Sequence, residues 1–251
     1  MPRNILITGG SGYIGGSLLA SLKTTSNILS RGTIYALVRN SEQAEKVKTH
    51  YSATPLTLDL EDQSAITATL LEKQISVVFF LINAFNADAQ VKFIEALAAV
   101  KAQHGLRTHF LHTTGAKLFS SFTGHPTDRI LSDAEEGLYE IQKGVRSKFP
   151  PMETVCAMSG TSVVSMLTDF HAFPCQAVGA NNKVIEAGEK HGVSTYIYIP
   201  CVVYGQGSGF GNRISIQTVA IVRAAKALRR VCKVDDGDGV SIKYQRIERL
   251  I

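Results

Sequence analysis

The sequence predicts an α/β protein built on a doubly wound parallel sheet, and three observations support this. β-rich runs alternate with segments of helical period through most of the 251 residues. Several of these runs are almost continuously apolar, such as VVFFLI at residues 77–82, which is typical of parallel strands covered on both faces. A glycine-rich loop joins the first strand to the first helix. Right-handed βαβ units are the expected connection between such strands.

The individual elements follow from the hydrophobic period and from the glycine, proline and polar residues between the runs. The expected strands are residues 4–8, 33–39, 54–60, 76–83, 107–114 and 195–203. The expected helices are residues 12–23, 41–48, 62–73, 88–104, 177–191 and 212–230.

Composition excludes several other classes of protein. With 45% hydrophobic residues the chain is too apolar for a disordered protein, and its four cysteines are too few for a disulfide framework. The longest apolar run, residues 77–82, is far shorter than the roughly 20 residues that span a bilayer. The N-terminus has no secretory pattern. We therefore expect a cytoplasmic protein that has no membrane segment.

The net charge of +5 raises the question of nucleic-acid binding, so its distribution matters. From Arg223 onward the chain carries eight basic and four acidic residues, and the preceding part is nearly neutral. A nucleic-acid groove needs a basic face on the folded body, with stacking aromatic residues. We expect no nucleic-acid partner. The histidines and cysteines also lack the spacing of metal ligands, so we expect no metal.

The glycine loop at residues 8–16 reads TGGSGYIGG, with a strand before it and an amphipathic helix after it. Its first glycine can turn the chain, its third lets the backbone approach a diphosphate, and its fourth lets the helix pack on the strand. The helix N-terminus supplies amide donors and the positive end of the helix dipole. This context predicts an NAD(P)-binding Rossmann fold. The cofactor contacts expected from the loop are Gly9, Ser11, Gly12, Tyr13, Ile14 and Gly15.

The residue at the end of the second expected strand bears on the choice of nicotinamide cofactor. An acidic residue there would bind the ribose hydroxyls of NAD. This chain has Arg39 instead, in the sequence ALVRNS. A guanidinium can pair with a 2′-phosphate and stack on adenine, so NADP is favoured over NAD. The alternative is a solvated surface arginine.

These features resemble the extended short-chain dehydrogenase/reductase superfamily, in its NAD-dependent epimerase/dehydratase-like branch, as an atypical, fungal-type member. The matching segments occur in the family's order between about residues 4 and 210. They are TGGSGYIG at 8–15, DL at 59–60, LINA at 81–84, HTTG at 112–115 and PCVVYG at 200–205. The resemblance implies that Asp59 and Leu60 contact the adenine, and that Asn83 and Ala84 line the cofactor.

The resemblance also implies hydride transfer between a nicotinamide and a hydroxyl or carbonyl group of a small-molecule substrate. Thr113 or Thr114 would occupy the catalytic serine/threonine position, and we name Thr114. The family uses a tyrosine as acid/base, and a lysine four residues later lowers its pKa from about 10. The motif YEIQK at residues 139–143 makes Tyr139 and Lys143 the candidates.

The position of this motif leaves an alternative open. Family members carry the tyrosine and lysine on the helix that leads into the sixth strand. Here that helix is expected at residues 177–191, where Gly179 stands four residues before Lys183. Tyr139 and Lys143 would then belong to a surface loop or helix. In that case the protein is a non-catalytic NADP-binding sensor, or an inactive truncated product of the enzyme family.

Two segments depart from the family pattern. Residues 156–176 contain no Lys, Arg or Glu and show no helix or strand period, and residues 239–251 end the chain where the family continues into a substrate-binding region. We interpret residues 1–204 as the NAD(P)-binding domain, with residues 156–176 as an insertion or a retained intron. Residues 205–251 are then a partial substrate-binding region with an irregular tail.

The helix expected at residues 212–230 ends in basic residues, which suit the C-terminal end of a helix dipole. We expect its apolar face to pack on the sheet. The alternative is a partner helix, for example in a homodimer.

Overall fold

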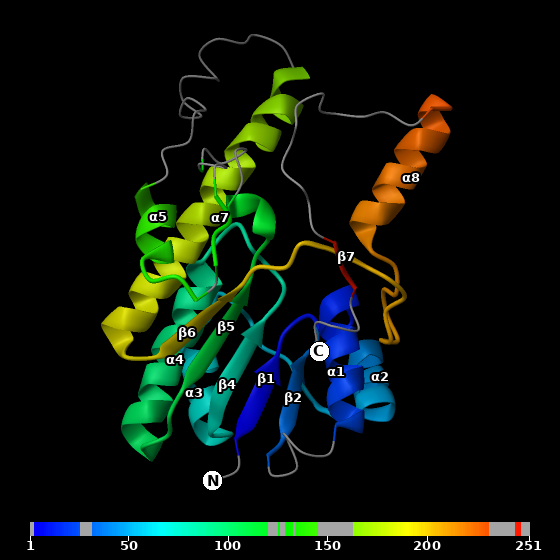
Figure 1. Cartoon of the computed structure of the whole chain (residues 1–251). Coiled ribbons are helices and arrows are strands. Elements are labelled where there is room, and N and C mark those ends of the chain that lie inside the picture. The colour runs from blue at the N-terminus through cyan, green and yellow to red at the C-terminus, as the bar shows by residue number, and fades with distance from the viewer. Residues whose placement is uncertain are drawn as a thin grey trace.

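The computed structural model describes residues 3–25, 32–119, 125, 129–132, 134–144, 163–230 and 244–246. These residues contain a six-stranded parallel sheet with the order β3-β2-β1-β4-β5-β6 (Figure 1). The strands are β1 (Asn4–Ile7), β2 (Ile34–Leu37), β3 (Thr54–Leu56), β4 (Ile75–Phe80), β5 (His109–Thr113) and β6 (Ser194–Tyr198). The chain winds outward in both directions from the β1–β4 pair. The predicted doubly wound parallel sheet is confirmed.

Helices cover both faces of this sheet. The described helices, including those that lie off the sheet, are α1 (Tyr13–Thr24), α2 (Ser41–Tyr51), α3 (Gln63–Glu72), α4 (Asp88–His104), α5 (Leu138–Gly144), α7 (Val163–His191), α8 (Ile216–Leu228) and the 3₁₀ helix η1 (Ala116–Phe119).

Two hydrophobic cores lie on opposite faces of the sheet. The core beneath α1 and α2 includes the buried side chains of Ile5, Ile7, Leu19, Val47 and Tyr51. The core beneath α3, α4 and α7 includes Ile66, Phe80, Phe93, Phe110 and Val184. In the second core the Phe80 ring centroid lies 5.8 Å from that of Phe93 and 5.9 Å from that of Phe110. Apolar side chains of the strands therefore contribute to the cores on both faces of the sheet, as the near-continuous apolar runs predict.

Local signals fix the ends of several helices. The Asn40 side chain caps α2 by accepting a hydrogen bond from the Gln43 amide, and Asp62 caps α3 through the Ala65 amide. Helix α4 ends at Gly105, whose φ of 65° is the left-handed conformation common at helix C-termini. These are short-range signals that the sequence alone displays.

One expected strand is divided in the structure. The run at residues 195–203 becomes β6 and a separate short strand, β7 (Val202–Tyr204). Pro200 lies between them and has no amide hydrogen to donate to a neighbouring strand, which interrupts the ladder. Strand β7 pairs in parallel with β8 (Tyr244–Arg246) instead of extending the main sheet.

Helix α7 begins much earlier than expected. The structure extends it back to Val163, so the expectation that residues 156–176 have no helical period was wrong for residues 163–176. Apolar residues at 163, 167 and 170 do recur at helical spacing, although Pro174 follows within the same helix. A helix can include such a proline at the loss of one backbone hydrogen bond. Residues 156–162 lie outside the described residues.

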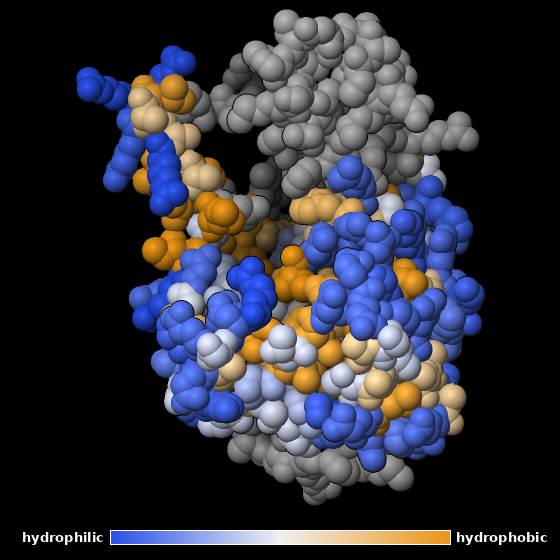
Figure 2. All heavy atoms as spheres, turned by 180° about the vertical axis from the view of Figure 1, so that it is seen from behind, coloured by the Kyte–Doolittle hydropathy of each residue, from blue (hydrophilic) through white to orange (hydrophobic). Residues whose placement is uncertain are grey.

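Helix α8 does not pack on the sheet, which corrects the expectation for residues 212–230. Ile216 is 78% exposed and Ile221 64% exposed, and Figure 2 shows the helix projecting from the body. The preceding loop, residues 205–215, attaches beside α1 and α2 and directs α8 away from the sheet (Figure 1).

In the part of the chain that the structure describes, every helix is too short or too polar to span a bilayer.

Candidate functional site

A cavity of about 1010 Å³ opens at the carboxyl ends of the strands, beside the switch point of the sheet, where the chain leaves the adjacent strands β1 and β4 in opposite directions. It is lined by the segments that follow β1, β2, β3, β4 and β5, and by parts of residues 200–216. Ligands of doubly wound folds bind at this switch point, because the loops from adjacent strands separate there.

The glycine loop forms one wall of this cavity. Gly9 has a φ of 69°, and a side chain at Gly15 would collide with the Gly9 carbonyl oxygen. Gly12 is the N-cap residue of α1, and no side chain caps that helix end. The amides of Tyr13, Ile14 and Gly15 therefore have no intrahelical acceptor. Uncapped amides at a helix N-terminus beside a cavity fit a diphosphate.

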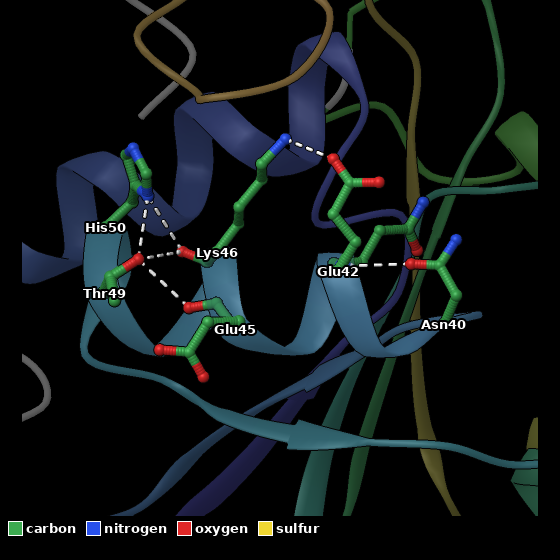
Figure 3. A network of polar contacts seen from close by, with 7 residues as sticks. Asn40, Glu42, Glu45, Lys46, Thr49 and His50 are labelled. Atoms are coloured by element: carbon green, nitrogen blue, oxygen red, sulfur yellow. Dashed lines mark hydrogen bonds and ion pairs between the residues drawn. The ribbon is translucent and has the colours of Figure 1, made fainter.

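Arg39 lies on the cavity wall at the end of β2, and its side chain is exposed. The Gln43 Oε1 atom accepts the Arg39 amide hydrogen at 3.0 Å, and Asn40 Oδ1 accepts the Gln43 amide hydrogen at 2.9 Å. Figure 3 shows Asn40 at this end of α2, with Glu42 turned toward Lys46. No ion pair among the described residues involves Arg39. The Arg39 backbone is thus fixed by a hydrogen bond, and its exposed guanidinium is suited to bind a phosphate group.

Only some of the residues that the resemblance assigns to the adenine and the cofactor line the cavity. Asp59 and Leu60 line the cavity, and Asp59 Oδ1 also accepts the Glu61 amide hydrogen at 2.9 Å. Asn83 and Ala84 do not line it. The Asn83 side chain instead accepts hydrogen bonds from the amides of Phe85 and Asn86, in the turn that precedes α4.

The residues after β4 and β5 that do line the cavity include two whose backbone amides are held by hydrogen bonds. Leu81 and Ile82 line the cavity, and the Leu81 amide donates to Thr8 Oγ1 at 2.8 Å. Thr114 and Gly115 line it after β5. The Thr114 amide donates to the Tyr198 carbonyl at 2.9 Å, which places this threonine at the junction of β5 and β6.

The predicted Tyr-Lys pair lies on α5 and does not line the cavity. The Tyr139 hydroxyl donates to Glu186 Oε1 of α7 at 2.9 Å, and Lys143 Nζ is 3.6 Å from the same oxygen. The Lys143 ammonium also lies 5.2 Å from the Tyr139 ring centroid. Burial and the hydrogen bond to Glu186 raise the pKa of Tyr139, whereas Lys143 acts to lower it. The structure thus brings Tyr139 and Lys143 together, but not with Thr114.

Helix α7 occupies the chain position that leads into β6, and it carries no tyrosine where Gly179 stands. Lys183 is exposed and lies 3.8 Å from Asp88 Oδ1. Asn181 is fully buried and donates to Gln142 Oε1 at 3.4 Å, which connects α7 to α5. A pair of buried amide side chains, Asn181 and Gln142, therefore lies between α7 and α5.

Several residues of the cavity wall are not predicted from the sequence. Gln43 was not identified, although its spacing from Asn40 is that of a capped first helical turn. Asn212, Ser215 and Ile216 also line the cavity. The glycine-rich run at residues 205–211 was the available signal for a tightly folded loop there.

The described residues contain no cluster of three or more potential metal-ligating side chains.

Comparisons with known proteins agree with this architecture. Residues 1–122 match the model of the NmrA-like family. The UDP-glucose 4-epimerase of Thermus thermophilus, solved with NAD, is 13% identical with a TM-score of 0.55, over 99% of this chain and 72% of that one. Vestitone reductase from alfalfa (Medicago sativa L.) is 14% identical with a TM-score of 0.52, over 98% and 70%. No curated protein sequence matches significantly.

The chain therefore shares its fold with this epimerase and this reductase, as the resemblance in its sequence implies. The N-terminal half of the chain, which holds the glycine loop, Arg39 and Asp59, is the part that the NmrA-like family model matches.

Proposed function

We propose that the cavity binds a nicotinamide dinucleotide and prefers NADP(H) to NAD(H). One observation carries this proposal: the uncapped N-terminus of α1 and the Arg39 guanidinium open onto the same cavity. The α1 amides would hold the diphosphate and Arg39 the 2′-phosphate. Asp59 and Leu60 would face the adenosine. Thr114 and Gly115 line the part of the wall contributed by β5, where the nicotinamide would extend.

The first candidate activity is that of an oxidoreductase or epimerase that acts on a hydroxyl or carbonyl group of a small molecule. A bound nicotinamide would supply the hydride donor or acceptor. The Thr114 hydroxyl would orient the substrate oxygen by a hydrogen bond. Tyr139 would transfer the proton to or from the substrate oxygen, and Lys143 would lower the pKa of Tyr139. Both roles require α5 to approach the cavity.

The second candidate is a protein that senses the cofactor without turnover. The observation in its favour is that the Tyr139 hydroxyl donates a hydrogen bond to Glu186, away from the cavity, and that the pKa of Tyr139 is raised. A raised pKa makes the phenol a poorer base at neutral pH. Of these two candidates, the described geometry gives more support to the sensor.

The two candidates are separated by binding and turnover measured on the same protein. Fluorescence titration with NADPH and NADH tests binding, and loss of NADPH absorbance with a panel of aldehydes and ketones tests turnover. Turnover that Tyr139→Phe abolishes would support the oxidoreductase. Tight NADPH binding without turnover on any substrate of the panel would support the sensor. Binding of neither cofactor by the folded chain would contradict both.

A further inference from the structure

The loop at residues 205–215 connects β7 to α8 and lies beside α1 and α2 (Figure 1). Four hydrogen bonds tie it there. They are Tyr13 hydroxyl to Gly205 carbonyl (2.8 Å), Ser208 amide to Ser17 Oγ (3.2 Å), Phe210 amide to Tyr51 hydroxyl (2.9 Å) and Asn212 amide to Ser11 carbonyl (3.2 Å). The donors and acceptors on the N-terminal side all belong to the glycine loop, α1 or α2.

The loop approaches the glycine loop closely enough to require glycine. A side chain at Gly211 would collide with the Ser11 carbonyl oxygen. A Cβ at Gly209 would lie 2.9 Å from the Cα of Gly16 in the first turn of α1. The backbone of residues 205–215 is therefore in direct contact with the backbone that would hold the diphosphate.

Tyr51 anchors this contact from outside the cavity. Its side chain is buried at the C-terminal end of α2, and its ring stacks on Phe210 with centroids 5.2 Å apart and an interplanar angle of 29°. Its hydroxyl accepts the Phe210 amide hydrogen. Tyr51 does not line the cavity, so it has no direct contact with a ligand there.

Residues at both ends of this loop line the cavity. Val203 lines the cavity just before the loop, and Asn212, Ser215 and Ile216 line it at the other end. A ligand that fills the cavity would contact both ends. Ligand binding and closure of the loop should therefore stabilise each other to the same extent.

We infer that residues 205–215 are a clamp that pre-organises the glycine loop for dinucleotide binding, and that Tyr51 is the positioning residue that holds it. This inference rests on the proposed function. The hydrogen bond from Asn212 to the Ser11 carbonyl stabilises the turn that directs the α1 amides toward the cavity. Loss of the clamp therefore lowers the fraction of protein molecules in the conformation that binds the dinucleotide.

The test compares Tyr51→Phe with the matched control Tyr35→Phe. Tyr35 is a partly buried tyrosine on β2 that, like Tyr51, does not line the cavity. Tyr51→Phe keeps the ring and removes the hydroxyl acceptor. We expect the Kd for NADPH and for NADH to rise about fivefold in Tyr51→Phe, the factor that one neutral hydrogen bond provides. Both values should be unchanged in Tyr35→Phe.

Hydrogen exchange supplies a readout that a purely structural role would not give. In the wild-type chain, saturating NADPH should slow amide exchange in residues 205–215, and this protection should be weaker in Tyr51→Phe. A second variant, Phe210→Leu, removes the ring stack from the clamp side and should give the same two effects. This variant keeps the test decisive if Tyr51→Phe fails to fold.

The possible failures are distinguishable. A folded wild-type chain that binds neither dinucleotide would contradict the proposed function, and the clamp with it. Wild-type binding combined with an unchanged Kd and unchanged exchange protection in both variants would contradict the clamp alone. Lower thermal stability with an unchanged Kd would show that Tyr51 has a structural role only.

Discussion

Tyr139 and Glu186 are joined by a hydrogen bond of 2.9 Å in which the phenol is the donor. This contact ties the predicted acid/base to a carboxylate of α7, and Lys143 lies 3.6 Å from the same carboxylate oxygen. Lys143, which the resemblance implies should lower the pKa of Tyr139, therefore also interacts with the negative charge of Glu186. Any reaction that uses Tyr139 must first break this arrangement.

The first prediction concerns the charge of Glu186. Burial and the hydrogen bond to Glu186 raise the pKa of Tyr139. Glu186→Gln removes the negative charge, so we expect the pKa of Tyr139 to fall. Absorbance of the phenolate, followed against pH, measures this value after subtraction of the Tyr139→Phe signal. An unchanged or higher pKa in Glu186→Gln would show that the contact does not form in solution.

Arg39→Ser should discriminate between the two cofactors. Loss of a charge-assisted contact to the 2′-phosphate should weaken NADPH binding about 10- to 100-fold and leave NADH binding nearly unchanged. Lys48→Ser is the control, because Lys48 is an exposed cation of α2 outside the cavity. Equal losses for both cofactors in Arg39→Ser would mean that Arg39 does not recognise the phosphate.

Two glycine substitutions should affect different properties, one cofactor binding and the other thermal stability. Gly15→Ala places a Cβ against the Gly9 carbonyl oxygen, so we expect the loss of dinucleotide binding. A Cβ at Gly179 meets no atom within 4 Å, and alanine is the better helix former by about 1 kcal/mol. Gly179→Ala should therefore raise Tm by about 2–4 °C without changing affinity. Thermal melts and titrations of both variants check this, and tight binding by Gly15→Ala would contradict the loop geometry.

The buried His112 should make the fold sensitive to acid. Desolvation lowers its pKa from 6.5 to about 4, and the Asn181 side chain partly offsets this effect. Between these two values the unfolded chain binds more protons than the folded chain, so stability falls as the pH falls through this window. His112 alone should cost about 2 kcal/mol between pH 7 and pH 5.

The control for this effect is His112→Leu, studied by urea denaturation at both pH values. The loss of unfolding free energy on acidification should be smaller in the variant than in the wild-type chain. Equal losses in the two proteins would show that His112 titrates normally in the folded state.

Much of the fold was predictable because its signals are local. The parallel doubly wound sheet follows from alternating β and α segments with right-handed crossovers, and cap-forming residues stand at Asn40 and Asp62 in the sequence. The early start of α7 is hard to predict because Pro174 is a residue type that usually interrupts or ends a helix. The division at Pro200 was missed because the flanking residues are strongly β-forming.

The site was predictable only in part. The glycine loop, Arg39 and Asp59 each follow a strand directly, so sequence position alone places them on the cavity. The clamp depends on contacts such as that between Tyr13 and Gly205, which are 192 residues apart. No local pattern reports such a contact. The placement of Tyr139 on α5 likewise depends on how α5 packs against α7, which spacing does not reveal.

The most direct test of the account is the ratio of the dissociation constants for NADP⁺ and NAD⁺, measured by isothermal titration calorimetry on the purified full chain. We expect one dinucleotide per chain, with NADP⁺ bound at least about tenfold more tightly than NAD⁺, the factor expected from one charge-assisted contact. Equal or tighter binding of NAD⁺ would contradict the role of Arg39, and no heat with either cofactor would contradict the binding site itself.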